Sequence, residues 1–291
     1  LSTGIHTFAD DNKLKNVEEV QTHSSGSQVV LTGQTEAFTI TGGDAADTIT
    51  GGSGIDTIMG GAGGDIITIG TAGHGNNDTI DGGAGSDVLQ LSTGIHTFAD
   101  DNKLKNVEKV QTHSSGSQVV LTGQTEAFTI TGGASADNIT GGAGNDIITG
   151  GAGNDIITGG AGLDNLEGGS GNDTFKIDAA YDTVTDLGGG SGTDSDIVVV
   201  TNVAILNATD MIGFTATSGT SNAGTATFNL KAGGVRTLDL SAATGAGSFI
   251  LKGNSGDDSI TGTAGADTIN AGAGADIILI GTAGHGNSDT I

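Results

Sequence analysis

The chain has 291 residues, and 34 acidic against 9 basic side chains give it a formal net charge of −25. Its 55 glycines are far above the roughly 7% share of average proteins, which argues against an ordinary globular core. The few scattered Lys and Arg residues exclude a basic stripe along a phosphate backbone, so nucleic acid is not an expected partner. The absence of cysteine excludes disulfides and thiolate metal sites. The sequence contains no run of about 18 apolar residues, so it predicts no transmembrane helix.

Residues 1–41 form a first spacer, in which we expect short strands. In the stretch VEEVQTHSSGSQVVLTGQTEAFTITGG, β-branched and polar residues alternate around glycines, a pattern typical of strands bounded by turns. Asp10 and Asp11 precede NKLKN and are expected to begin a turn or a short helix, with an additional metal contact as the alternative. We predict that the spacer forms wide coils of a β-solenoid.

The second spacer, residues 91–131, duplicates the first. Residues 1–43 recur as residues 91–133 with a single change, Glu19 to Lys109. Such near-identity indicates a recent duplication. Duplication of a whole unit lengthens or tiles a scaffold but does little for an enzyme.

A nine-residue pattern of the form GGxGxDxxx fills three blocks, at residues 42–90, 132–187 and 253–291, and we expect the third block to be truncated. The eighth position is apolar nearly throughout, so each repeat is predicted to form one short strand with a single inward side chain. Neighbouring repeats must therefore stack to form a core. The sixth position is aspartate, at Asp47, Asp56, Asp65, Asp78, Asp87, Asp137, Asp146, Asp155, Asp164, Asp173, Asp258, Asp267, Asp276 and Asp289.

The composition of the repeat indicates a metal-binding turn. Glycines at positions one, two and four permit the backbone angles of a tight turn and let carbonyl oxygens point inward. Aspartate adds a short carboxylate at the exit of the turn, and calcium accepts about six to eight hard oxygen ligands in flexible geometry. We predict several bound Ca²⁺ ions, because metal-free aspartate turns would leave stacked carboxylates repelling one another. Besides the aspartates, the predicted ligands are Gly51, Gly60, Gly82, Gly132, Gly141, Gly150, Gly159, Gly168, Gly253 and Gly262.

The repeats resemble the glycine-rich nonapeptide of the RTX, or hemolysin-type calcium-binding, proteins over residues 42–90, 132–176 and 253–291. The resemblance implies an all-β fold, a parallel β-roll or β-solenoid with two nonapeptides per coil. It places calcium between successive turns on each edge, held by motif aspartates and glycine carbonyls. It also implies a secreted or cell-surface bacterial protein exported by type I secretion. Weaker or terminal sites are expected where the pattern fails, at Asp44, Ala45, Ala46, Asn254, Thr263 and Ala271.

Residues 188–252 lack the nonapeptide, yet we expect them to be β structure. Runs of β-branched and apolar residues indicate strands at residues 197–200, 225–230, 236–241 and 248–253. The stretch over residues 236–263 resembles junctions found in RTX-containing bacterial S-layer proteins.

Other chemistry finds little support in the sequence. The six histidines belong to no zinc motif such as HExxH, so we expect them to face solvent; they are His6, His23, His74, His96, His113 and His285. There is no nucleophile elbow, no phosphate-binding loop and no isolated carboxylate pair in an apolar setting, so we do not expect an enzyme.

Three functions are consistent with these features. We favour an extracellular structural protein of a surface layer or filament, in which calcium folds and rigidifies the solenoid and copies self-associate into a lattice or filament. A cell-surface polysaccharide is a further candidate partner. The alternatives are the calcium-stiffened stalk of a giant RTX adhesin and the C-terminal secretion and folding module of an RTX enzyme or toxin.

Overall fold

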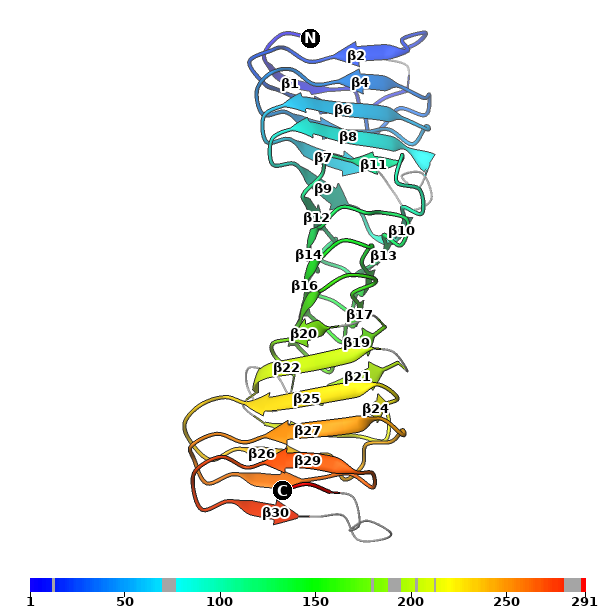
Figure 1. Ribbon diagram of the computed structural model, residues 1–291. Helices are drawn as coiled ribbons and strands as arrows, with labels where there is room; N and C mark the ends of the chain where they lie inside the picture. The colour runs from blue at the N-terminus through cyan, green and yellow to red at the C-terminus, as the bar shows by residue number, and fades with distance from the viewer. Residues whose placement is uncertain are drawn as a thin grey trace. The chain divides into compact units, whose positions relative to one another are not determined.

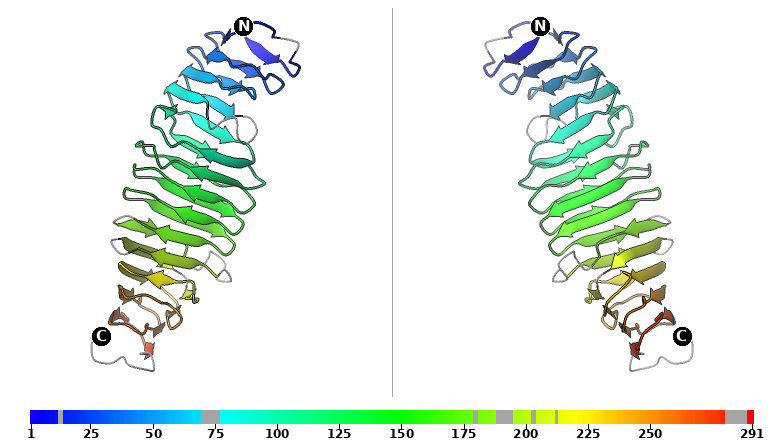
Figure 2. Two further views of the ribbon diagram at one scale, coloured as in Figure 1. Left: turned by 90° about the vertical axis from the view of Figure 1, so that its right-hand side faces the viewer. Right: turned by 90° about the vertical axis from the view of Figure 1, so that its left-hand side faces the viewer.

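A computed structural model describes the chain except for residues 12–13, 70–76, 179–180, 188–194, 202–203, 212 and 280–288. The described residues form parallel strands that wind as a β-solenoid, which confirms the predicted fold. Two compact units are present. Unit 1 comprises Leu1–Gly133 with Gly141–Ala143, and unit 2 comprises Ala134–Thr140 with Gly144–Ile291. In each unit the strands stack as successive rungs (Figures 1 and 2).

Unit 1 contains three groups of paired strands. The first has the order β1 (Gly4–Thr7), β3 (Ser27–Val30), β5 (Thr48–Thr50), β7 (Ile66–Ile69), β9 (Val88–Leu91), β12 (Lys109–Gln111) and β14 (Thr129–Thr131). The second has the order β2 (Glu19–Gln21), β4 (Thr39–Thr41), β6 (Thr57–Ala62), β8 (Thr79–Ala84) and β11 (Leu104–Lys105). In the third, β10 (Gly94–Thr97) pairs with β13 (Ser117–Val120).

Unit 2 is built in the same way. Its first group has the order β16 (Ile147–Ala152), β18 (Asn165–Ser170), β20 (Asp182–Val184), β22 (Ile205–Met211), β25 (Thr225–Leu230), β27 (Ser248–Lys252) and β29 (Asp267–Asn270). The second has the order β15 (Asn138–Thr140), β17 (Ile156–Thr158), β19 (Thr174–Ile177), β21 (Ile197–Val200) and β24 (Ser221–Asn222). The third has the order β23 (Phe214–Thr215), β26 (Thr237–Asp239), β28 (Ser259–Thr261) and β30 (Ile277–Leu279).

The strand register gives the length of one coil. Within the nonapeptide blocks Ile139 pairs with Ile157, so one coil takes 18 residues, or two nonapeptides, as the resemblance implied. In the first spacer Ile5 pairs with Gln28, 23 residues further on, which agrees with the expected wider coil. The strands expected in residues 188–252 are present as β21, β25, β26 and β27.

The core is a column of inward side chains, one or two from each strand. The eighth-position residues are buried as predicted, except Ile278, which is half-buried, and Ile49, Ile58 and Ile157 are fully inaccessible. Each buried side chain of this size contributes roughly 1.5–3 kcal/mol of hydrophobic stabilisation. In the segment without nonapeptides the core includes an aromatic stack, in which Phe228 packs on Phe214 at 5.7 Å and on Phe249 at 6.0 Å between ring centroids.

The two spacer copies fold alike but lie in different strand groups. In the first copy, β1 and β3 belong to the group that also contains β5, whereas their counterparts β10 and β13 form a separate group. The counterparts of β2 and β4 are β12 and β14, which lie in the group of β1. The second copy therefore begins at a different point around the coil from the first.

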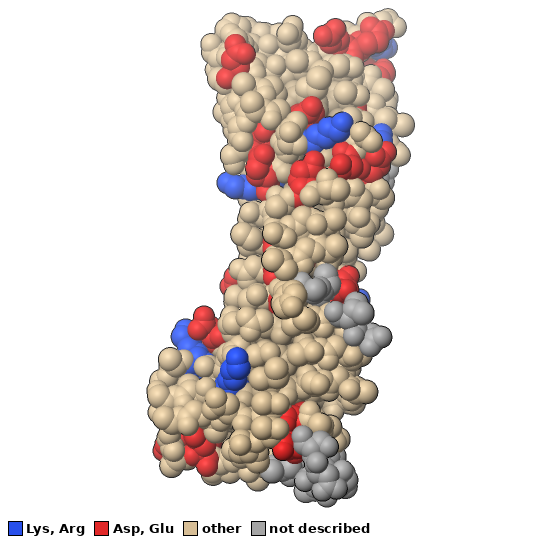
Figure 3. Space-filling view, in the orientation of Figure 1, with Lys and Arg blue, Asp and Glu red and all other residues tan. Residues whose placement is uncertain are grey.

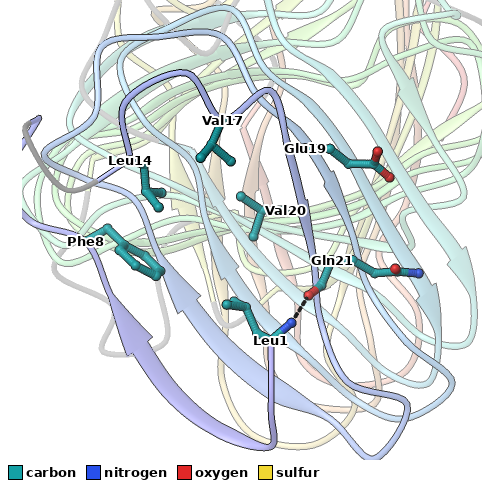
Figure 4. A pocket seen from close by; sticks show the side chains of 7 residues that line it. All are labelled: Leu1, Phe8, Leu14, Val17, Glu19, Val20 and Gln21. Carbon is teal, nitrogen blue, oxygen red and sulfur yellow. Dashed lines mark hydrogen bonds between the residues drawn. The ribbon is translucent and has the colours of Figure 1, made fainter.

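The spacer copies also differ in how deeply they are buried. Figure 4 shows a pocket in the first copy, lined by Leu1, Phe8, Leu14, Val17, Glu19, Val20 and Gln21, in which the Leu1 amino group donates to the Gln21 carbonyl at 2.7 Å. The ring of Phe8 is half-buried, whereas its counterpart Phe98 is only 1% exposed. Identical sequences thus give a complete core only where another coil packs against them.

The expected turn at NKLKN is present in the second copy. Asp100 to Lys103 form a turn, with the Lys103 amide donating to the Asp100 carbonyl at 2.8 Å, and the short strand β11 follows instead of a helix. Asp11 and its counterpart Asp101 accept hydrogen bonds from Thr35 and Thr125. These bonds join one coil to the next.

Candidate metal sites in the glycine-rich turns

The motif aspartates lie where each turn enters a strand. Twelve of the fourteen are at most 3% exposed, while Asp276 and Asp289 are half-buried. On the face drawn in Figure 3, acidic side chains form separate patches beside a few basic ones and leave most of the surface uncharged, although the chain carries a net charge of −25. Much of the negative charge is therefore inside the turns.

Successive motif aspartates on one edge form a hydrogen-bonded ladder. The Oδ1 atom of each aspartate accepts the backbone N–H of the motif aspartate one coil earlier. The distances are 2.7 Å from Asp47 to Asp65, 2.8 Å from Asp56 to Asp78 and 2.8 Å from Asp155 to Asp173. This aspartate ladder brings like charges one coil apart along each edge, an arrangement that favours a cation between them.

The turns occur in two conformations. In the open turns, the glycines at positions two and four both have positive φ, for example +108° at Gly151 and +123° at Gly153. The open turns begin at Gly60, Gly82, Gly150, Gly159, Gly168 and Ala271. In the closed turns neither position has positive φ, and these turns begin at Gly42, Gly51, Gly132, Gly141, Gly253 and Gly262.

The two conformations treat the second carboxylate oxygen differently. In closed turns the position-two N–H donates to Oδ2 of the same repeat, at 2.7 Å from Gly43 to Asp47 and at 2.6 Å from Thr263 to Asp267. In four of the six open turns Oδ2 is buried and has no hydrogen-bond partner among the described residues, namely at Asp65, Asp87, Asp155 and Asp164. A buried carboxylate oxygen without a donor is costly unless a cation binds it.

The preceding coil, and not the nonapeptide sequence, determines the conformation. The repeats at residues 141–149 and 150–158 are both GGAGNDIIT, yet the first turn is closed and the second is open. In every block the first two turns are closed. In the first block these two turns follow a spacer coil, and Gly52 packs against the carbonyl of Gln34 in that coil. Open turns pack on an earlier nonapeptide turn, as Gly61 does on the Gly43 carbonyl.

Oxygen atoms converge beside the position-one glycine of the open turns. A Cβ on Gly150 would lie 2.7 Å from the Gly168 carbonyl oxygen of the next coil and closer still to Oδ2 of Asp155. At Gly60 the Gly82 carbonyl and Oδ2 of Asp65 take the same places. The glycines keep this space free, so a carboxylate and a carbonyl from consecutive coils face one small volume.

The turn electrostatics also favour a cation. Burial, aided by the negative charges of neighbouring aspartates, raises the pKa of Asp65, Asp155 and Asp164 to about 6, although N–H donors partly oppose the shift. The same causes raise the pKa of Asp173 to about 7. A bound divalent ion would remove this penalty on the ionised form.

The donor set fits calcium better than a metal that prefers nitrogen or sulfur. Among the described residues no three His, Asp or Glu side chains form a ready-made metal centre, so an ion must also use main-chain carbonyls. Buried carboxylate oxygens and main-chain carbonyl oxygens are the hard oxygen donors that Ca²⁺ accepts. Asp155 with the Gly168 carbonyl, and Asp65 with the Gly82 carbonyl, are the groups that would hold it.

The structure extends the ladders beyond the predicted residues. Asp182 and Asp196 are buried and accept the N–H groups of Asp164 at 3.2 Å and Asp173 at 2.9 Å. Asp182 stands nine residues after Asp173, a signal already present in the sequence, whereas an insertion separates Asp196 from that spacing. Glu108 of the second spacer takes the same role for Asp87, at 2.7 Å.

The histidines show one departure from expectation. His23 and His113 are exposed, as expected, but His96 is completely buried and bonds to the Ser92 carbonyl at 2.9 Å. The expectation was wrong there because the second spacer is covered by another coil. His74 and His285 lie outside the described residues.

Fold and site together define a parallel β-solenoid with cation-binding turns along its edges. The family model described as the RTX calcium-binding nonapeptide repeat (4 copies) matches residues 39–70, 72–94, 129–157, 140–175 and 250–285. The chain therefore carries RTX calcium-binding nonapeptide repeats over these residues. A comparison with curated proteins finds no match. In the described part of the chain there is no helix of the length and apolarity needed to cross a membrane.

Proposed function

We propose that this chain is an extracellular structural scaffold, part of a surface layer or filament, whose solenoid folds and becomes rigid when calcium binds. The observation that carries the proposal is the aspartate ladder, in which buried carboxylates repeat along each edge, with Oδ2 atoms that lack donors in four of the open turns. Such a ladder serves the stability of the whole solenoid.

Calcium binding is then coupled to folding. Without the ion, ionised aspartates in consecutive coils repel one another and keep their desolvation penalty. With the ion, the binding free energy adds to the stability of the folded chain. Extracellular calcium modules bind in a range of about 10⁻⁴–10⁻³ M, so the proposed place of folding is outside the cell.

The duplicated spacer supports a scaffold made of repeated units. Because the second copy begins at a different point around the coil, β1 and its counterpart β10 lie in different strand groups of unit 1. Equivalent side chains are therefore presented on two faces of this unit. We propose that these faces permit lateral contacts between copies, so that self-association gives a lattice or a filament, with cell-surface polysaccharide as a further partner.

Electron microscopy of the purified chain with calcium, and after removal of calcium, tests the scaffold. We expect ordered lattices or filaments that disperse when calcium is removed. Isolated rods would contradict self-association and favour the stalk of an adhesin. Assemblies that persist without calcium would contradict the coupling between ion binding and order.

A further inference from the structure

The first spacer leaves an apolar face of unit 1 open. Strands β1 and β2 are the outermost strands of their groups, so within the described chain each has one edge without a strand partner. Beside these edges, the pocket of Figure 4 is lined by the apolar side chains of Leu1, Phe8, Leu14, Val17 and Val20. Leu1 is 43% exposed, and Phe8, Leu14 and Val17 are half-buried. An open strand edge next to apolar side chains is a template for pairing with another chain.

The second spacer shows what covers such a face. The counterparts of the five apolar residues are at most 3% exposed, namely Leu91, Phe98, Leu104, Val107 and Val110. Their cover is a nonapeptide coil, because β8 pairs with β11 and β9 pairs with β12. The single difference between the spacers, Glu19 against Lys109, is exposed in both copies. A nonapeptide coil therefore fits the open face of the first spacer as well.

The sequence of that covering coil recurs in unit 2. Residues 278–291 repeat residues 67–80 with two changes. Ile291 therefore corresponds to Ile80, which pairs with Leu104 of the second spacer. The counterpart of Leu104 in the first spacer is one of the residues that line the open pocket.

Unit 2 displays this sequence at an open edge. Strand β30 is the outermost strand of its group. Three apolar side chains on β30 and after it are more than half exposed, namely Ile277, Leu279 and Ile291. Unit 1 thus has an apolar face that fits a nonapeptide coil, and unit 2 has a nonapeptide coil whose edge is open.

We infer that copies of this chain associate head to tail, with the nonapeptide edge of unit 2 in one copy stacked on the first spacer of the next. In this joint Ile291 of one copy lies beside Leu14 of the other, as Ile80 pairs with Leu104 inside unit 1. A joint between two different surfaces leaves one of each kind free, so it adds further copies in a row. The inference rests on the proposed self-association and names an interface for it in addition to the lateral contacts.

Sedimentation velocity of the 291-residue chain in saturating calcium tests the joint by substitutions on its two sides. Leu14→Asp alters the spacer face and Ile291→Asp alters the nonapeptide edge. Each should weaken association at least about tenfold, because the joint would bury an unpaired charge. An equal mixture of the two variants should form one-to-one dimers, because one intact surface of each kind remains.

Ile55→Asp is the matched control. Ile55 is 62% exposed in a turn of unit 1, away from β1, β2 and β30, so this variant should associate like the unaltered chain. Circular dichroism in calcium checks that each variant keeps its β structure. If Leu14→Asp does not fold, Leu1→Asp repeats the test at a more exposed side chain of the same pocket.

Two results would overturn the joint. Unchanged association of both variants would exclude these surfaces, and loss in Leu14→Asp alone would indicate a contact between two first spacers. If calcium-dependent lattices or filaments still form in the variants, the proposed scaffold stands on its lateral contacts while the joint falls. If the unaltered chain does not associate in calcium at all, the joint and the proposed self-association both fail.

Discussion

Positions two and four of the open turns require glycine for two separate reasons. Their φ values, such as +126° at Gly171, are strained for residues with a Cβ. The Gly153 carbonyl of the previous coil also occupies the space that a Cβ on Gly171 would need. In the closed turn at Gly262, the corresponding Gly265 has neither restriction, since its nearest contact is Oγ1 of Thr263 at 3.5 Å.

Alanine at these two glycines should therefore have unequal effects. Gly171→Ala is expected to lower the free energy of unfolding by about 1–3 kcal/mol, whereas Gly265→Ala should change it by less than about 1 kcal/mol in either direction. Urea unfolding in saturating calcium measures both. Equal losses would mean that the two turn conformations do not differ as described.

Alanine substitutions of the motif aspartates should also have unequal effects on calcium-dependent folding. Oδ2 of Asp155 has no donor, whereas Oδ2 of Asp47 accepts bonds from Gly43 and from Thr22 at 3.1 Å. We expect Asp155→Ala to raise the calcium midpoint of folding about three- to tenfold, because it removes a charged ligand. Asp47→Ala should raise it less, and the reverse order in a calcium titration followed by circular dichroism would refute the distinction.

At the scale of the element, the ladder predicts an unusual pH dependence. A carboxyl group whose pKa is higher in the folded chain than in the unfolded chain binds more protons when folded, so stability falls as the pH rises between the two values. For Asp65 and Asp155 the window runs from the ordinary 3.8 to about 6, and for Asp173 and Asp182 it extends to about 7. In the absence of calcium, protons therefore stabilise the turns.

In buffer stripped of calcium, we expect β circular dichroism to be strongest near about pH 4 and to be lost as the pH rises to about 7.5. Calcium should restore it at neutral pH by neutralising the same carboxylates. Calcium affinity should correspondingly increase with pH across this window. A calcium-free β signal that grows as the pH rises from 4 to 7 would show that the sign of the effect is wrong.

The two spacers allow one element to be compared in two settings. The amide of Phe8 donates to Val30 and that of Phe98 to Val120, both at 2.8 Å, so the strands are alike and only the covering coil differs. Phe98→Ala should cost about 3–5 kcal/mol of unfolding free energy, and Phe8→Ala about 1–2 kcal/mol because its ring is already partly exposed. Urea unfolding of the two variants is the measurement, and similar costs would contradict the difference in burial.

Much of the fold follows from the nine-residue spacing. A single apolar residue at position eight fixes one inward side chain per strand, which is what Ile148 and Ile157 provide. The turn conformation could not be predicted, because GGAGNDIIT adopts both states depending on the preceding coil. The burial of His96 has the same origin. Asp182 could have been found by extending the spacing beyond the glycine-rich repeats.

At the scale of the whole molecule, charge and fold are linked through the ion. A chain with a net charge of −25 places many of its carboxylates inside its turns, where ionisation opposes folding. Hydrophobic burial in a narrow column of single side chains must then be supplemented by cation binding. The glycines provide the space and the carbonyl oxygens for that binding.

Calcium-dependent folding is tested most directly by circular dichroism of the whole chain at neutral pH during a calcium titration that starts from calcium-free buffer. We predict a disordered spectrum at the start and a cooperative gain of β signal as calcium is added, reversed by EGTA. Magnesium at the same ionic strength is the control and should not substitute, because it demands a small octahedral site. A full β signal before any calcium is added would contradict the account.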